Sequence, residues 1–314
     1  MPIKTTIERL LYQKAYQRKI RSLGGQQRIV LSSTPRGGST WLQQVLMAEQ
    51  SVGVWEPLHP KWLTTIVGQD NGHHDLFAKP DQDLPALEEY LKSVLFRGKT
   101  TEEMRLPRAP LRKVKEAKYV VFKFCRLLPL LPWYLKRFDT KVVHLARSPF
   151  AVVSSQLRHP AWDYVKQQSS YYANSDSYCP SFYQNYASLT SKLRHPEEFL
   201  TAKWCLDYIP LTQQQQSENL CVIHYEDLVN LGVDHFKAAF TFLGLSFDNS
   251  LENLVSMPSF TTQKGSNVLQ GKNPLSTYRS HLNNEQIGRI EDTLSSFGLS
   301  DWKSSLSHHE ILSA

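Results

Sequence analysis

The sequence of 314 residues has no apolar run long enough to cross a bilayer, and no apolar segment of the kind that opens a secreted protein. We therefore expect a cytoplasmic protein. Its few cysteines show no Cys-x-x-Cys spacing, which favours a reduced protein. Internal repeats, low-complexity tracts and blocks of lysine and arginine are also missing. With a formal net charge of only +7, the composition does not predict a nucleic-acid partner.

A further absence concerns nucleotides. The pattern Gly-x-x-x-x-Gly-Lys-Ser/Thr of nucleotide hydrolases does not occur. In its place, residues 28–41 read Arg-Ile-Val-Leu-Ser-Ser-Thr-Pro-Arg-Gly-Gly-Ser-Thr-Trp, an apolar strand followed by a turn and a new helix. Two glycines let successive N–H groups point at one place, and the helix start adds unpaired donors. This predicts an anion cradle, in which Arg36 can grip two oxygens of a phosphoryl or sulfuryl group.

Alternation of strands and helices predicts the fold class. Apolar runs indicate strands at about 28–33, 51–55, 119–124, 141–146 and 219–224. Helical patterns fall at about 39–49, 84–96, 128–138, 149–158, 184–214, 233–243 and 283–297. We expect one α/β domain over residues 1–314, with a P-loop-like three-layer fold whose central parallel sheet of about five strands is flanked by helices. Residues 56–118 are rich in Pro, Gly and charge, and we expect an insert that shapes access for the acceptor.

The N-terminal segment, residues 1–25, has the pattern of a basic amphipathic helix. Four apolar residues line one face, Ile3, Ile7, Leu10 and Leu11, and basic residues lie elsewhere. Such a helix can rest on anionic lipid or pack on its own domain, and we expect the second.

Three of the predicted strands end near basic residues: Arg36, Lys123 and Arg147. The carboxyl ends of parallel strands meet at the ligand crevice, so these cations should surround one polyanion. An acidic residue to hold magnesium, which an ATPase or kinase needs, is not found at these ends. We expect no metal.

Several motifs then resemble the PAPS-dependent sulfotransferases, over residues 28–302. Thr34 to Trp41 resembles their 5′-phosphosulfate loop, and Arg147 to Ser155 resembles their 3′-phosphate motif. His224 to Leu228 is similar to their Tyr-Glu-Asp-Leu signature, and Gln263 to Ser266 is similar to the loop that closes over the nucleotide. PAPS is the co-substrate that this resemblance implies.

The resemblance also implies catalytic roles. Arg36 and Lys123 would stabilise charge on the transferring group. The cytosolic sulfotransferases place a His base two residues after that Lys, but here Cys125 stands there. The stretch Glu56-Pro57-Leu58-His59 resembles the Glu-Pro-Leu/Val-x-His stretch of the carbohydrate and bacterial type, which makes Glu56 the expected base and His59 the alternate. Nearness to Arg36 should lower the pKa of Glu56, whereas burial should raise it. An ion pair with a structural role is the other interpretation of Glu56.

Nucleotide contacts follow from the same resemblance. Trp41 matches the tryptophan that stacks on adenine, and Tyr225 would contact the adenine edge. The full implied set is Arg36, Gly37, Gly38, Ser39, Thr40, Trp41, Arg147, Ser155, Tyr225, Lys264 and Gly265.

The sequence thus predicts a sulfotransferase that moves a sulfuryl group from PAPS to a hydroxyl or amine and releases PAP. A carbohydrate, a glycolipid and a small molecule are all open as acceptors. Two alternatives stay open, a protein that only senses a phosphorylated nucleotide and a kinase that reuses the phosphate loop.

Overall fold

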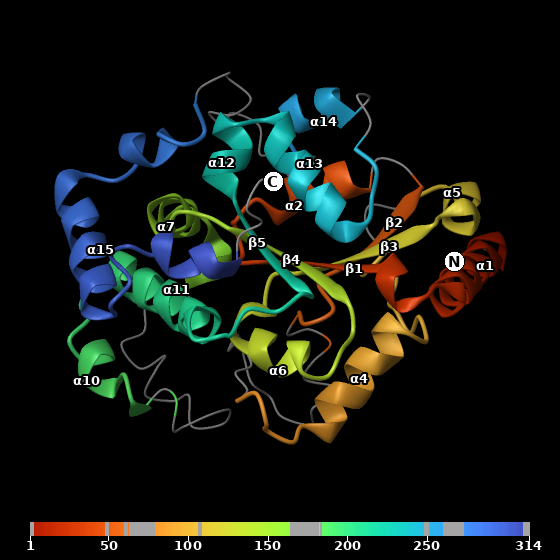
Figure 1. Cartoon of the computed structure of the whole chain (residues 1–314), viewed down its shortest axis with the longest axis horizontal. Helices are drawn as coiled ribbons and strands as arrows, with labels where there is room; N and C mark the ends of the chain where they lie inside the picture. The colour runs from red at the N-terminus through yellow and green to blue at the C-terminus, as the bar shows by residue number, and fades with distance from the viewer. Residues whose placement is uncertain are drawn as a thin grey trace.

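A five-stranded parallel sheet forms the centre of the computed structural model (Figure 1). The structure describes residues 3–47, 50–59, 62, 79–105, 109–163, 182, 184–247, 251–259 and 273–309. The strands lie in the order β2-β3-β1-β4-β5 and have the bounds β1 Arg28–Ser33, β2 Ser51–Trp55, β3 Tyr119–Phe124, β4 Lys141–Ala146 and β5 Leu220–His224. Strand β1 pairs with β3 and β4, so the loop after β1 opens at the middle of the sheet edge.

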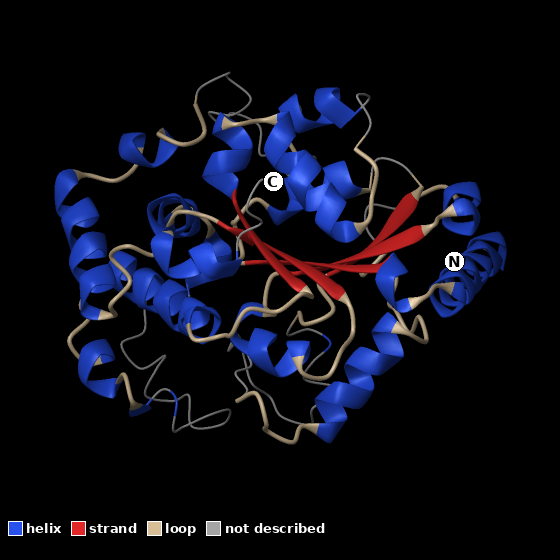
Figure 2. Ribbon diagram, viewed as in Figure 1, coloured by secondary structure: helices blue, strands red, loops and turns tan. Residues whose placement is uncertain are grey.

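Helices cover both faces of the sheet (Figure 2). Their bounds are α1 Ile3–Ser22, α2 Ser39–Leu46, α4 Pro85–Leu95, α5 Leu111–Glu116, α6 Leu131–Leu135, α7 Pro149–Leu157, α10 Ala187–Thr190, α11 Pro196–Thr212, α12 Tyr225–Asn230, α13 Val233–Leu243, α14 Glu252–Ser256 and α15 Asn284–Ser296. Short 3-10 turns lie at Gly25–Gln27, Leu128–Leu130, Pro160–Trp162, Thr277–Ser280 and Ser304–His309.

Alternate strand residues point to two separate apolar cores, which makes the fold three-layered. In β1, Ile29 and Leu31 pack with α2 and α13, whereas Val30 packs with α1, α4, α6, α7 and α11. Strands buried on both faces are nearly all apolar, which is why the sequence marks them so clearly. The predicted α/β fold with a central parallel sheet is confirmed.

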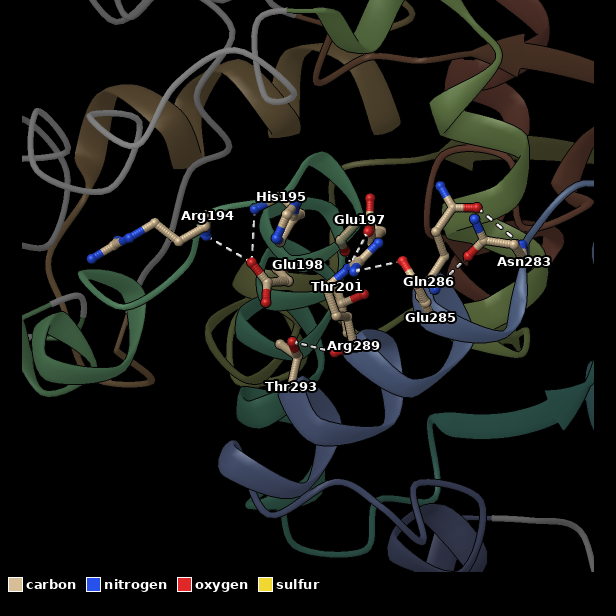
Figure 3. A network of polar contacts seen from close by, with 10 residues as sticks. All are labelled: Arg194, His195, Glu197, Glu198, Thr201, Asn283, Glu285, Gln286, Arg289 and Thr293. Carbon is tan, nitrogen blue, oxygen red and sulfur yellow. Dashed lines mark hydrogen bonds and ion pairs between the residues drawn. The ribbon is translucent and has the colours of Figure 1, made fainter.

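Two predicted helices are divided in the structure. The pattern at 184–214 forms α10 and α11, because Pro196 has no N–H to continue a helix and instead begins one. The Glu198 carboxylate accepts the N–H groups of Arg194 and His195 at 2.7 Å each, which closes the start of α11 (Figure 3). The pattern at 128–138 likewise forms a 3-10 turn followed by the short helix α6.

Helices α11 and α15 are joined by a partly buried ion pair (Figure 3). Nε of Arg289 lies 2.6 Å from Oε1 of Glu197, whose side chain is only 4% exposed. Asn283 caps α15 by accepting the N–H of Gln286 at 2.8 Å. These contacts fix the outer layer behind α7, the helix that carries Ser155.

The N-terminal helix is confirmed, but Leu10 and Leu11 do not face the domain. The buried side is formed by Tyr12, Tyr16 and Ile20. The hydroxyl of Tyr16 donates to the Gly53 carbonyl of β2 at 3.2 Å. No helix in the described part of the chain is both long and apolar enough to cross a membrane.

Candidate active site

The loop between β1 and α2 contains a tight turn at Gly37 and Gly38, where a side chain has no room. The Gly37 N–H donates to the Thr34 carbonyl at 2.9 Å. A Cβ on Gly37 would lie 2.2 Å from Oγ of Ser33, and a Cβ on Gly38 would lie 2.8 Å from the Tyr225 ring. Gly38 also has φ 98°, which disfavours any side chain. The two glycines therefore let the chain turn tightly between the end of β1 and the N-terminus of α2.

Arg36 projects from this cradle toward α7. Its own backbone has φ 71°, uncommon for a residue with a side chain. Nε of Arg36 donates to Oγ of Ser155 at 3.0 Å, and Nη1 of Arg147 donates to the Arg36 carbonyl at 3.1 Å. The structure thus brings together three residues that the sequence assigned to two different phosphates.

Positive charge accumulates here, and the described residues provide no counterion for it. Burial lowers the pKa of Arg36, and the charges of Arg147 and Arg158 lower it further. Among the described residues, no carboxylate pairs with Arg36 or Arg147, and Nε of Arg147 is buried without a hydrogen-bond partner. Cations that repel one another and an unsatisfied donor fit a site for a polyanion. Sequence reasoning missed Arg158, one turn beyond Ser155.

Two aromatic rings, those of Tyr225 and Trp41, pack near Arg147. Cζ of Arg147 lies 4.1 Å above the centre of the Tyr225 ring. Trp41 meets Tyr225 edge-on with ring centres 5.4 Å apart, and its indole Nε1 donates to the Val255 carbonyl at 3.0 Å. The Tyr225 ring therefore lies between Trp41 and Arg147 and contacts both.

A second polar group lies at the ends of β2 and β3. Nζ of Lys123 is 3.2 Å from Oε1 of Glu56 and 3.3 Å from Oγ1 of Thr40. It also lies 4.5 Å from the centre of the Trp55 ring. The Lys123 side chain is 2% exposed and that of Glu56 is 11% exposed. Through Thr40, this pair touches the start of α2 and thus the phosphate loop.

Glu56 is held in a strained backbone conformation with φ 50°. Its N–H donates to the Lys123 carbonyl at 2.8 Å, and its Oε2 accepts the N–H of Cys125 at 2.9 Å. Its carbonyl accepts Nε1 of Trp62 at 2.7 Å. Backbone strain of this kind persists where surrounding contacts over-determine the conformation, and it is frequent at functional sites.

The sequence left open which effect controls the pKa of Glu56. Burial raises it, but the charges of Lys123 and Arg126 and the hydrogen bond from Cys125 outweigh burial, so the pKa lies below its ordinary value. The carboxylate is therefore ionised. The cation responsible is Lys123, not Arg36 as the sequence suggested, because Lys123 reaches back from β3 into the turn after β2.

The Cys125 thiol is less suited than Glu56 to take a proton. Burial, followed by the charge of Glu56, raises the pKa of the Cys125 thiol to about 12, so the thiol is neutral. Its Sγ lies 3.4 Å from Oγ of Ser39. His59 is in the turn after Glu56, with its ring centre 5.3 Å from that of Trp62.

Glu226 is a second residue of the candidate site that sequence reasoning missed. Oε1 of Glu226 accepts the N–H of Ser148 at 3.0 Å and so fixes the turn that carries Arg147 into α7. The Tyr-Glu-Asp-Leu stretch directly after β5 was the available signal. Lys264 and Gly265, assigned from the sequence to the closing loop, lie outside the described residues. The described part of the chain holds no group of three or more potential metal ligands.

The chain matches a known protein family over most of its length. A profile described as "Sulfotransferase domain" matches residues 26–308. The chain belongs to this sulfotransferase family. Membership confirms the resemblance drawn from the motifs and the general reaction class, transfer of a sulfuryl group. No curated protein matches the chain in sequence.

Solved structures of sulfotransferases are similar in outline. The sulfotransferase domain of the Synechococcus PCC 7002 olefin synthase is 18% identical, with a TM-score of 0.44, and the match covers 84% of this chain and 93% of that one. A mouse sulfotransferase solved with PAP is 13% identical, with a TM-score of 0.45, and the match covers 95% of this chain and 93% of that one.

Proposed function

We propose that this sulfotransferase moves a sulfuryl group from PAPS to a hydroxyl or amine of a carbohydrate, glycolipid or small-molecule acceptor and releases PAP. One observation carries the proposal: an ionised, nearly buried Glu56 paired with Lys123 beside the phosphate loop. A protein that only senses a nucleotide has no need of a carboxylate there. A kinase would need carboxylates for magnesium, and this one is already paired with a lysine.

The reaction requires a base and fixed cations. Glu56 accepts the proton of the acceptor as its oxygen or nitrogen attacks sulfur, the bond from sulfur to the bridging oxygen breaks, and PAP departs with the electron pair. Arg36 and Lys123 stabilise the charge that develops on the bridging and sulfuryl oxygens. When the Lys123 ammonium group moves from Glu56 to the sulfuryl group, Glu56 loses the positive charge that lowers its pKa. The pKa of Glu56 then rises and the carboxylate becomes a stronger base.

The nucleotide is held by the group around α7. Arg147 and Ser155 bind the 3′-phosphate, while Trp41 and Tyr225 contact adenine. The N–H groups of Gly38, Ser39 and Thr40 surround the 5′-phosphosulfate with Arg36, the turn at Gly37 lets the backbone approach it, and Lys264 and Gly265 close over the site. The buried unpaired Nε of Arg147 and the loop that excludes Cβ atoms support this assignment.

The acceptor enters from the other side of the cradle. Residues 1–314 form one domain in this proposal, and the insert at 56–118 shapes access to Glu56. The Glu-Pro-Leu stretch that begins at Glu56 favours a carbohydrate hydroxyl, as in the group of sulfotransferases that it resembles.

A Glu56→Gln variant tests the proposal, with Glu291→Gln on the exposed face of α15 as the matched control. We expect Glu56→Gln to lose about 100-fold or more of sulfuryl transfer from radiolabelled PAPS across an acceptor panel. It should still show a thermal shift with PAP, without magnesium. Transfer at the rate of the control would exclude Glu56 as base. A shift only with ATP and magnesium would overturn the choice of nucleotide.

A further inference from the structure

Helix α1 buries one face against the domain and leaves two leucines exposed on the other. Tyr12, Tyr16 and Ile20 are buried against the domain. In contrast, the side chains of Leu10 and Leu11 are 51% and 54% exposed. Because the buried face already anchors the helix, packing within the domain does not account for two neighbouring exposed leucines.

Basic residues continue the same outer side of the helix. Lys14, Arg18 and Arg21 are exposed and, at about 100° per residue, share with the two leucines an arc of about 100°. We call these five residues the outer stripe of α1. Glu8, the acidic residue of this helix, falls outside that arc. Arg21 donates to the carbonyl of Arg97 at 3.2 Å, and in the described part of the chain no carboxylate pairs with the three cations.

The position of the helix leaves the outer stripe accessible. Helix α1 lies at the edge of the molecule beside α5 (Figure 1). Its inner side is turned to the domain, where Tyr12 donates to the Ala109 carbonyl at 2.6 Å. The outer stripe therefore faces away from the sheet and its ligand site.

We propose that the outer stripe of α1 binds the surface of an anionic lipid bilayer. Leu10 and Leu11 insert at the boundary of headgroups and acyl chains, and Lys14, Arg18 and Arg21 contact the headgroup phosphates further along the helix. The pattern of charge argues for this occupant, because a second copy of the chain would bring the same cations face to face. A bound nucleic acid would leave the two leucines without a role. The contact is peripheral and needs no membrane-spanning segment.

Sedimentation with vesicles tests this surface on the full chain. We expect binding to vesicles of 70% phosphatidylcholine and 30% phosphatidylserine, little binding to phosphatidylcholine alone, and release by salt. Each cation near an anionic surface contributes about fivefold to partitioning, and a leucine adds to this. The double variant Leu11→Gln/Lys14→Gln should therefore bind at least about tenfold more weakly, with an unchanged thermal melt.

A control with the same two substitutions is available elsewhere on the surface. Leu231, which is 57% exposed, and Lys192 can be changed to glutamine in one chain. This control should bind vesicles like the natural sequence. Equal binding by the two double variants would overturn the proposal, as would failure of the natural sequence to bind anionic vesicles. A concentration-dependent dimer that only Leu11→Gln/Lys14→Gln abolishes would also overturn it, by assigning the stripe to self-association.

Discussion

The candidate site has a nucleotide side, around Arg36 and Arg147, and an acceptor side, around Glu56 and Lys123. The two sides differ in whether their cations are paired with a carboxylate. On the nucleotide side, Arg36 meets Arg147, neither pairs with a carboxylate in the part of the chain that the structure describes, and burial lowers the pKa of Arg36. On the acceptor side, Lys123 has its own counterion in Glu56. In the proposed function the nucleotide supplies counterions for the two arginines, whereas Lys123 already has one in Glu56. Binding and chemistry would then depend on different residues, so we expect a substitution to affect mainly one of them.

The largest effect is expected where the neutral pair is broken. Lys123→Met removes the cation that pairs with the buried Glu56 carboxylate, and breaking a buried pair in this way typically costs about 3–5 kcal/mol. The double variant Glu56→Gln/Lys123→Met removes both charges and should recover much of that loss. Denaturant unfolding of the two single variants and the double variant measures the coupling. Additive losses would show that Glu56 and Lys123 do not act as a pair.

A smaller effect, confined to binding, is expected on the nucleotide side. Arg147→Ala should weaken PAP by about 10- to 100-fold, because hydrogen bonds to charged groups contribute about 1.5–3 kcal/mol. It should leave the affinity for 5′-AMP, which lacks the 3′-phosphate, nearly unchanged. Calorimetry with both nucleotides checks this. Equal weakening of the two would place Arg147 away from the 3′-phosphate.

A buried neutral histidine in β4 contacts β1, the strand that leads into the nucleotide side. Nδ1 of His144 lies 3.1 Å from Oγ of Ser32, and burial, then His224 and His309, lowers the pKa of His144 to about 3. Because the unfolded chain binds this proton near pH 6.5 and the folded chain does not, stability is present above pH 6.5 and is lost as the pH falls toward 3. The loss should reach about 2 kcal/mol at pH 5.

Unfolding free energies at pH 7.5 and pH 5 measure that loss. His144→Gln should show a shallower dependence on pH than the natural sequence, whatever its absolute stability. An unchanged slope would mean that His144 carries a proton in the folded protein or that other groups dominate.

The smallest effect is expected at Cys125. Since burial and Glu56 raise the pKa of this thiol to about 12, almost no thiolate is present at pH 8. We expect Cys125→Ala to keep transfer activity within about threefold, and iodoacetamide to label Cys125 slowly. Rapid labelling with loss of activity would assign the thiol a place in the chemistry of the acceptor side.

The sequence predicted the sheet and the nucleotide side better than the acceptor side. Buried strands such as β1 are apolar throughout, and the position of Arg147 after β4 followed from the family motif. The pairing of Lys123 with Glu56 depends on a positive φ and on the backbone N–H of Cys125, which no pattern of residue types encodes. Pro196 was a visible boundary, but the apolar pattern continues across it and concealed the end of α10.

Glu56 has one more consequence, for attempts to stabilise this protein. Glycine adopts the left-handed backbone at position 56 without strain, but it would leave Lys123 without a counterion. Joint replacement of both residues by Gly and Met would therefore be favoured in a selection for heat resistance alone. Selection for turnover would oppose the same change, so thermal stability and activity make opposite demands on the turn at Glu56.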